Sequence, residues 1–139
     1  MDETREDREL RIRIWYPAII PEGVGIEEET YGGHIDAELD SSGARYPLIL
    51  FSHWYTSSSI NDFKLFKHLA SHGFIVASID HRCDSKPTCL VDRPMDVLFA
   101  LDQIAQETED RFAGVVDTDH AGVMGISFGG YTALAAAGA

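Results

Sequence analysis

The sequence predicts an α/β fold in which a mostly parallel sheet carries helices on both faces. Continuous apolar runs of strand length alternate with segments of helical spacing along the 139 residues. A half-exposed strand alternates apolar and polar residues, whereas an apolar run without this alternation is typical of a strand that is covered on both faces. Strands that alternate with helices in this way pair in parallel through right-handed crossovers.

The first part of the chain predicts a half-buried strand, a long loop and a buried strand. Residues 10–16 (LRIRIWY) alternate apolar and polar side chains, which indicates a half-buried strand. Residues 17–46 hold prolines, glycines and a run of glutamates, so we expect an acidic, loop-rich segment with one short strand near residues 34–39. Residues 47–52 (PLILFS) are the first continuous apolar run and predict a buried strand.

Helical spacing follows over residues 61–72. One apolar stripe recurs at i, i+3, i+6 and i+7, which favours an amphipathic helix; its members are Phe63, Phe66, Leu69 and Ala70. Gly73 is expected to end this helix as a C-cap. Residues 74–79 (FIVASI) then predict a second buried strand.

The last third of the chain predicts helix, strand and helix. Asp92 is expected to cap a helix whose first turn holds Pro94. The buried face of this helix would consist of Val97, Leu98, Leu101, Ile104 and Ala105. Residues 121–126 predict a third buried strand. Residues 128–137 are rich in small helix formers, and Gly138 is expected to end them.

Charge and hydropathy restrict the partners and the compartment. The net charge is −12, which argues against nucleic acid and anionic membrane surfaces and is typical of a well-solvated surface. A salt-adapted source would also fit this acidity. No stretch approaches the ~18 apolar residues of a membrane span, and the charged start MDETREDREL has no apolar signal core. We therefore expect a cytoplasmic protein in which Cys83 and Cys89 are thiols, with a local disulfide as the alternative.

A serine between glycines carries the functional signal. Residues 125–129 (GISFG) match G-x-S-x-G, with a buried strand before and a helix after, so Ser127 is expected at a sharp strand-to-helix turn as a nucleophile. The helix N-terminus there favours a developing negative charge. In the alternative interpretation, Ser127 only caps the helix. An oxyanion hole would use the N–H of Phe128 and, from the loop after residues 47–52, the N–H of Tyr55.

A general base is not evident in the sequence. In this arrangement the acid and the histidine follow the serine in the chain, whereas the six histidines all precede Ser127. His68 and His72, four apart on a helix, are expected in surface or packing roles, and His120 lies at the far end of its strand. Only His53 and His81 are expected at the carboxyl edge of the sheet.

The motifs together resemble the N-terminal half of an α/β-hydrolase of the dienelactone-hydrolase-like group. The resemblance is closest to the platelet-activating-factor acetylhydrolase type, with features of cutinase-like polyester hydrolases. The stretches that carry it are residues 8–10, 15–18, 46–48, 51–53, 69–76, 79–82, 93–97, 101–102 and 127–130, while residues 55–56 and 58–60 resemble the cutinase-like enzymes.

This resemblance implies a serine carboxylic-ester hydrolase without metal or organic cofactor, acting through an acyl-enzyme on Ser127. Its substrates would be short-chain acyl esters, acetylated phospholipids among them, with polyesters as the second choice. It implies that Gly125, Gly129 and Gly130 shape the elbow and that Trp54 and Tyr55 line the substrate cleft. Trp54 and Ile126 depart from the family's glycine and histidine, and we expect Ile126 to pack behind the elbow.

The resemblance also implies that the chain is part of a single domain. It makes His53 and His81 loop-orienting residues, and it predicts that residues 1–139 end after the elbow helix, lack the acid and histidine, and are inactive alone. The alternative function is a non-catalytic α/β module, or one half of a split hydrolase. Such a module would bind a partner chain through residues 121–126, an open edge strand.

Overall fold

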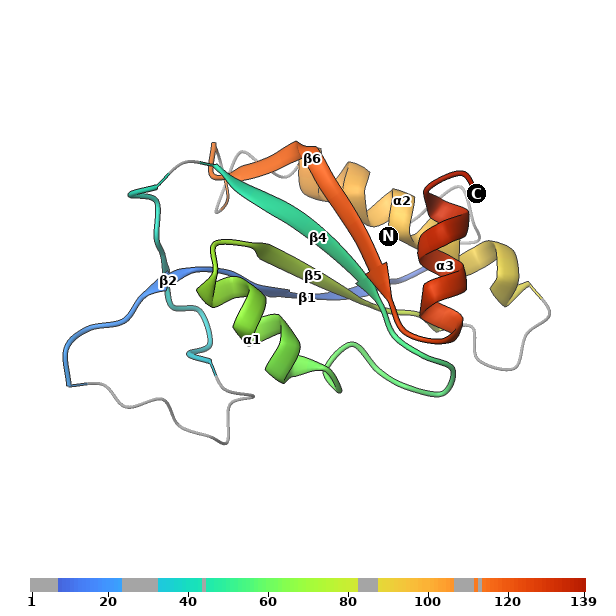
Figure 1. Cartoon of the computed structure of the whole chain (residues 1–139), viewed down its shortest axis with the longest axis horizontal. Coiled ribbons are helices and arrows are strands. Elements are labelled where there is room, and N and C mark those ends of the chain that lie inside the picture. The colour runs from blue at the N-terminus through green and yellow to red at the C-terminus, as the bar shows by residue number, and fades with distance from the viewer. Residues whose placement is uncertain (1–7, 24–32, 44, 83–87, 107–111, 113) are drawn as a thin grey trace.

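The computed structural model describes residues 8–23, 33–43, 45–82, 88–106, 112 and 114–139. Its elements, in chain order, are β1 (Arg11–Trp15), β2 (Ala18–Ile19), β3 (Glu38–Leu39), β4 (Tyr46–Ser52), α1 (Phe63–Ser71), β5 (Ile75–Asp80), α2 (Cys89–Gln106), β6 (Val116–Gly125) and α3 (Phe128–Ala136). Figure 1 shows the strands side by side with helices packed against them.

The main sheet has the strand order β1-β5-β4-β6. β4 pairs in parallel with both β5 and β6, and β1 runs antiparallel to β5, so the predicted mostly parallel α/β sheet is confirmed. The carboxyl ends of β4, β5 and β6 therefore meet at one edge, which Ser52, Asp80 and Gly125 mark. β2 and β3 form a separate two-stranded sheet, so the short strand expected near residues 34–39 is present as Glu38–Leu39.

Two apolar clusters fill the two faces of the sheet. On one face, α2 packs against β4 and β5, and the buried side chains include Leu48, Ile75 and Val97. On the other face, α1 brings Phe66 against Phe51 and Val76. The ring of Phe66 lies 4.7 Å from the ring of Phe51, centroid to centroid. Helices on both faces explain why these strands read as continuous apolar runs.

α1 follows the sequence prediction closely. Phe66 and Ala70 of the predicted stripe are buried. Gly73 adopts a φ of +83° just beyond the helix, and its amide donates to the carbonyl of Ala70 at 3.1 Å. Only glycine adopts this left-handed conformation without steric cost, so the predicted C-cap is confirmed.

The predicted start of α2 is wrong. The helix begins at Cys89, and the carbonyl of Thr88 already accepts the amides of Val91 and Asp92. Pro94 thus lies inside the helix, where its missing N–H leaves the carbonyl of Leu90 without its helical donor. The hydroxyl of Tyr131, on α3, donates to that carbonyl at 3.3 Å, which compensates for the proline.

The earlier start of α2 also changes which of its residues are buried. Leu98 is 41% exposed and Ala105 is exposed, although both were expected on the buried face. The buried positions of the helix are Cys89, Arg93, Pro94, Asp96, Val97, Ala100 and Ile104. Two charged residues, Arg93 and Asp96, are among these buried positions, and a search for apolar periodicity does not include them.

Two further expectations need correction. β6 begins at Val116 rather than at residue 121, because its polar first half pairs with the start of β4 across an irregular register. Cys89 is disulfide-bonded rather than a thiol, and the other cysteine of the chain, Cys83, lies outside the described residues. None of the helices among the described residues is long and apolar enough to cross a membrane.

Candidate functional site

Ser127 lies at the sharp turn between β6 and α3 in a strained backbone conformation. Its φ of 54° and ψ of −117° fall in a region that residues with a Cβ rarely adopt. The residue is exposed. Its hydroxyl makes no capping hydrogen bond to α3, so the geometry gives no support to the interpretation in which Ser127 only caps the helix.

Two glycines allow the backbone to close around this turn. A Cβ on Gly129 would overlap the carbonyl oxygen of Ser52 and lie 2.9 Å from that of His53. A Cβ on Gly125 would overlap the carbonyl oxygen of Gly129. A Cβ on Gly130, by contrast, would stand 3.6 Å from the Gly125 carbonyl oxygen, which is an ordinary contact. The elbow is therefore packed directly against the end of β4.

The loop after β4 brings Tyr55 close to the elbow. The amide of Ser57 donates to the carbonyl of Trp54 at 3.2 Å and closes a tight turn, in which Thr56 has a φ of +58°. The ring of Tyr55 lies edge-on to the ring of Phe128, with centroids 6.2 Å apart. Within the described part of the chain, the amides of Tyr55 and Phe128 have no hydrogen-bond acceptor, so both can serve an external oxyanion.

His53 sets the direction of the Tyr55 amide. Its ring is fully buried, and Nε2 accepts the backbone N–H of His81 at 3.3 Å, which places the ring proton on Nδ1. Nδ1 then donates to the carbonyl of Trp54 at 2.7 Å. The peptide between Trp54 and Tyr55 is planar, so fixing its carbonyl also fixes its N–H.

The far end of the same loop is tied to the sheet. Ser59 is fully buried, and its amide donates to Oδ1 of Asp80 at 3.3 Å. Arg13, on β1, donates to the hydroxyl of Ser59 and lies 3.5 Å from Oδ2 of Asp80. The loop that carries Tyr55 is thus anchored at both of its ends.

A chain of largely buried hydrogen bonds starts at Ser52, the last residue of β4 before this loop. The hydroxyl of Ser52 is 2.9 Å from Nε2 of His81, and Nδ1 of His81 is 2.8 Å from Oδ2 of Asp96. Arg8 closes the chain with two bonds to Asp96, at 2.8 and 3.0 Å. This is a serine–histidine–aspartate row, but Ser52 is fully buried and cannot meet a substrate.

Burial and hydrogen bonding fix the charges in this chain. Burial lowers the pKa of His81 below its ordinary value of 6.5, against the opposing effect of Asp96. Burial alone would raise the pKa of Asp96, but the hydrogen bonds from His81 and Arg8 outweigh it and bring that pKa below 3.8. At neutral pH a neutral imidazole therefore lies between a hydroxyl and a carboxylate, and both of its nitrogens are engaged.

A model of the PET hydrolase-like family, PETase, matches residues 25–139. The chain belongs to the PET hydrolase-like family. Its place in the α/β-hydrolase superfamily, predicted from the sequence, is thereby confirmed. A search of curated proteins gave no match.

A solved structure with the same fold is the ferulic acid esterase from Streptomyces cinnamoneus. The TM-score is 0.75 and the sequence identity is 22%, so the likeness concerns the fold. The match covers 94% of this chain and 48% of the esterase. This PET hydrolase-like chain therefore spans about half the length of that relative.

The other histidines of this PET hydrolase-like chain lie away from Ser127. His68, on α1, and His72, at its C-cap, are exposed, and their rings are tilted at 48° with centroids 4.3 Å apart, as expected for a surface role. His120 is exposed and bonds to Asp117 at 2.8 Å, which lowers the pKa of that carboxyl. Ile126, which was expected to pack behind the elbow, is 41% exposed, so that expectation is wrong for the described residues.

The structure adds three polar residues that sequence reasoning missed as members of the site. They are Arg8, Arg93 and Asp96: Arg93 bonds to the carbonyl of His53, Asp96 bonds to His81, and Arg8 bonds to Asp96. A signal was present, since Arg93 and Asp96 are three apart and interrupt the apolar face of a helix. Such an interruption indicates buried polar side chains that have partners elsewhere.

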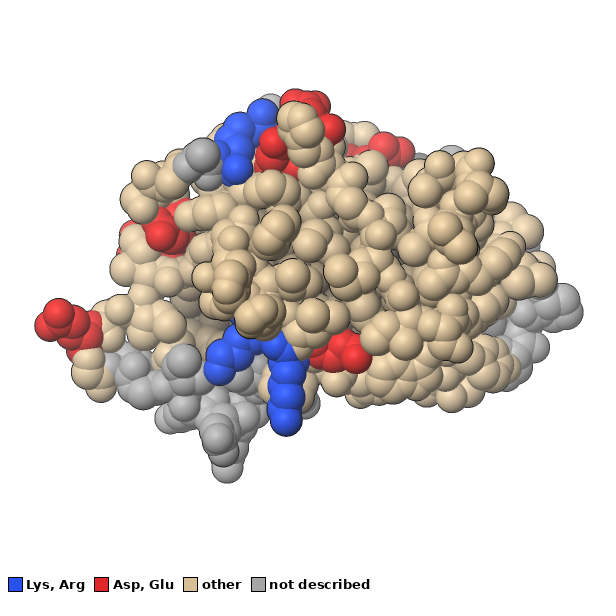
Figure 2. Space-filling view, viewed as in Figure 1, with Lys and Arg blue, Asp and Glu red and all other residues tan. Residues whose placement is uncertain are grey.

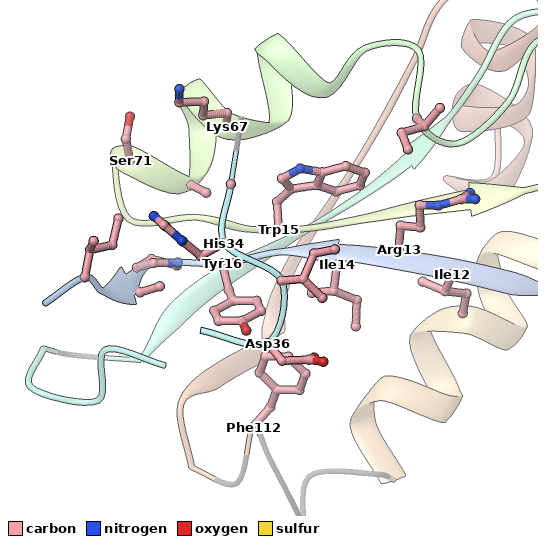
Figure 3. A pocket seen from close by; sticks show the side chains of 17 residues that line it. Ile12, Arg13, Ile14, Trp15, Tyr16, His34, Asp36, Lys67, Ser71 and Phe112 are labelled. Atoms are coloured by element: carbon pink, nitrogen blue, oxygen red, sulfur yellow. The ribbon is translucent and has the colours of Figure 1, made fainter. Parts of the chain in front are cut away.

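A cavity of about 760 Å³ lies at the opposite edge of the sheet. Trp15, at the end of β1, and Tyr16, directly after it, line this cavity, and Figure 3 shows the Tyr16 ring between His34 and Phe112. Tyr16 packs edge-on against Phe112 and donates its hydroxyl to the carbonyl of Ala37 at 2.8 Å. The strand order places β5 and β4 between this cavity and the β6 edge that carries Ser127.

Proposed function

We propose that this chain carries the nucleophile and the oxyanion hole of a serine carboxylic-ester hydrolase. Ser127 attacks the acyl carbonyl, and the amides of Tyr55 and Phe128 hold the oxyanion that forms. Water then releases the acyl group in a second step. Gly125, Gly129 and Gly130 shape the elbow, and no metal or organic cofactor takes part.

One observation carries this proposal: Ser127 is exposed in a strained conformation and its hydroxyl caps nothing. Strain of this kind persists only where the surrounding structure imposes it, and it is concentrated at functional sites. The glycine contacts of the elbow supply that constraint. The membership in the PET hydrolase-like family supports the same reaction class.

We further propose that the general base is not one of the described histidines, and that these 139 residues alone are inactive. His53 and His81 are fully or almost fully buried, and hydrogen bonds engage both nitrogens of each ring. They orient the loop and do not take the proton of Ser127. In the whole protein an acid and a histidine that follow Ser127 in the chain would complete the triad.

The substrates we propose are short-chain acyl esters, including acetylated phospholipids as in the platelet-activating-factor acetylhydrolase type. Polyesters are the second choice, and the description of the family, PET hydrolase-like, supports them. The cleft wall would be aromatic, since Tyr55 is 47% exposed and Trp54 is half-buried next to it. Aromatic walls suit flat or apolar acyl groups.

Chemical rescue tests the reaction class on the chain as it stands. Imidazole in solution can replace a missing histidine as the base, so we expect imidazole to accelerate hydrolysis of p-nitrophenyl acetate by the protein beyond the sum of the separate rates. Ser127→Ala should abolish this gain, and Ser42→Ala, at an exposed serine of a distant turn, should retain it. Equal rescue of wild type and Ser127→Ala would contradict the proposal.

A second candidate function is binding of a partner chain at the β6 edge. Among the described residues β6 pairs only with β4, so its other edge has no strand against it. Figure 2 shows few charged side chains over α3 and the second half of β6, whereas charged side chains gather at the start of β6. Tyr131 and Leu134 of α3 are 44% and 64% exposed. Sedimentation tests this second candidate. Assembly of the wild-type chain that is lost in Leu134→Lys would favour partner binding, and a monomer at all concentrations would count against it.

The disulfide at Cys89 bears on the compartment that we propose. Disulfides persist in oxidising compartments and are rare in the cytosol, so this bond favours an oxidising setting over the cytoplasm. Mass spectrometry after alkylation without reductant tests the choice. Alkylation of Cys89 in protein taken directly from its source cells would restore the cytoplasmic interpretation.

A further inference from the structure

Arg93 is fully buried in α2, yet its guanidinium reaches residues on both sides of the proposed oxyanion hole. Nη1 donates to the carbonyl of His53 at 2.7 Å. The guanidinium carbon also lies 4.7 Å from the centroid of the Phe128 ring. One side chain therefore contacts the residue that begins the Tyr55 loop and the residue that follows the nucleophile.

The contact with His53 fixes the start of the loop. His53 is the first residue after β4, and its ring holds the carbonyl of Trp54 in the peptide that carries the Tyr55 N–H. A hydrogen bond from a charged donor is stronger than one between neutral groups. Arg93 thus holds the backbone of the same residue whose ring orients the Tyr55 amide.

The contact with Phe128 fixes the other donor. A cation over the face of an aromatic ring is attracted to it, and more strongly where water is excluded. The Phe128 ring is also stacked on Tyr131 at 5.8 Å and meets the edge of Tyr55 at 6.2 Å. These contacts leave the ring little freedom, and its own amide is the second proposed oxyanion donor.

The end of β4 and the elbow also contact each other directly. Gly129 lies so close to the end of β4 that a Cβ there would overlap the Ser52 carbonyl oxygen. Movement of the His53 carbonyl would therefore displace the elbow as well as the loop.

We propose that Arg93 is a positioning residue that sets the separation of the Tyr55 and Phe128 amides, and thereby the shape of the oxyanion hole. This inference rests on the proposed function. Arg93 itself touches no reacting atom. It acts through the carbonyl of His53 and the ring of Phe128.

The expected effect is on the chemical step and not on binding. Oxyanion donors act when they lie about 2.7–3.1 Å from the position of the developing charge. A misplacement of about 1 Å can cost roughly 100-fold in rate. Loss of Arg93 should lower the maximal rate at which an alkyl fluorophosphonate modifies Ser127 by about 10-fold or more, with the half-saturating concentration unchanged.

The experiment compares Arg93→Met and Arg93→Lys with a matched control, Arg45→Met. Arg45 also donates to a backbone carbonyl, that of Val116 at 2.8 Å, but at the opposite end of β4 and β6. Lysine keeps the charge of Arg93 and loses its planar fork, so its effect should be intermediate. It also keeps the inference testable should the methionine variant not fold.

Two readouts separate this inference from the proposed function. The first is the ¹H–¹⁵N signal of the Tyr55 and Phe128 amides, which needs no chemistry at Ser127. The second is the saturation kinetics of phosphonylation. We expect both amide signals to shift in the Arg93 variants and neither signal to shift in Arg45→Met. We also expect the maximal rate of phosphonylation to fall only in the Arg93 variants.

The outcomes are distinct. Folded Arg93 variants with unshifted amides and a rate within twofold of wild type would overturn the role of Arg93. Wild-type protein that forms no adduct at Ser127 even when imidazole is supplied as the base would overturn the proposed function, and the amide signals would still decide whether Arg93 positions the two donors. A fall in rate with a matching rise in the half-saturating concentration would point to binding and would also contradict this inference.

Discussion

The strained backbone of Ser127 predicts that glycine at this position makes the protein more stable. The φ of 54° and ψ of −117° suit glycine and cost other residues of order 1–3 kcal/mol. Glycine gives back about 0.4–1 kcal/mol through the greater entropy of the unfolded chain. The difference is a gain of about 1 kcal/mol for Ser127→Gly, or roughly 4 °C in melting temperature for a chain of this size.

Urea unfolding followed by circular dichroism measures this gain, with Ser127→Ala as the matched control. Alanine keeps the Cβ and therefore the strain. Because the hydroxyl of Ser127 makes no capping bond, its removal should change the free energy of unfolding very little. If Ser127→Gly proves no more stable than Ser127→Ala, the backbone of Ser127 is not strained in solution. That result would contradict the proposal that the strained turn marks a functional site.

Three further predictions concern the elbow, the core and the buried histidine. Gly129→Ala should destabilise the fold by about 1–3 kcal/mol or more through overlap with β4, whereas Gly130→Ala should be almost neutral in the same urea titration; equal losses would refute the packing argument. Phe66→Ala should cost about 3–5 kcal/mol, because the ring is fully buried between the sheet and α1, and a loss under 1 kcal/mol would mean that this core is not formed. Since the pKa of His81 is lower in the folded state than 6.5, the unfolded chain binds the additional proton first, and the free energy of unfolding should fall as the pH drops below 6.5. His81→Gln should flatten this dependence between pH 7 and pH 5, and an unchanged slope would show that another group is responsible.

Much of the fold was predictable from local pattern because the strands covered on both faces read as unbroken apolar runs. The C-cap at Gly73 and the turn at Ser127 were predictable because few residue types suit those backbone conformations. Both features are properties of short segments, so neither needed knowledge of distant contacts.

The errors arose where a distant partner overrides a local rule. Pro94 indicated a helix start, but the hydroxyl of Tyr131 satisfies the carbonyl that the proline leaves free. The polar residues before residue 121 hid the first half of β6, which β4 holds in place. The buried group of Arg8, Arg93 and Asp96 joins segments that are up to 88 residues apart, so no window of the sequence contains it.

Site mapping of a fluorophosphonate adduct tests the central claim, that Ser127 is a nucleophile, most directly. The protein is incubated with an excess of the reagent and digested, and the modified residue is located by tandem mass spectrometry. We expect a slow single adduct on Ser127 that imidazole accelerates, and no adduct at any residue in Ser127→Ala. An adduct on another serine, or the same labelling of wild type and Ser127→Ala, would contradict it.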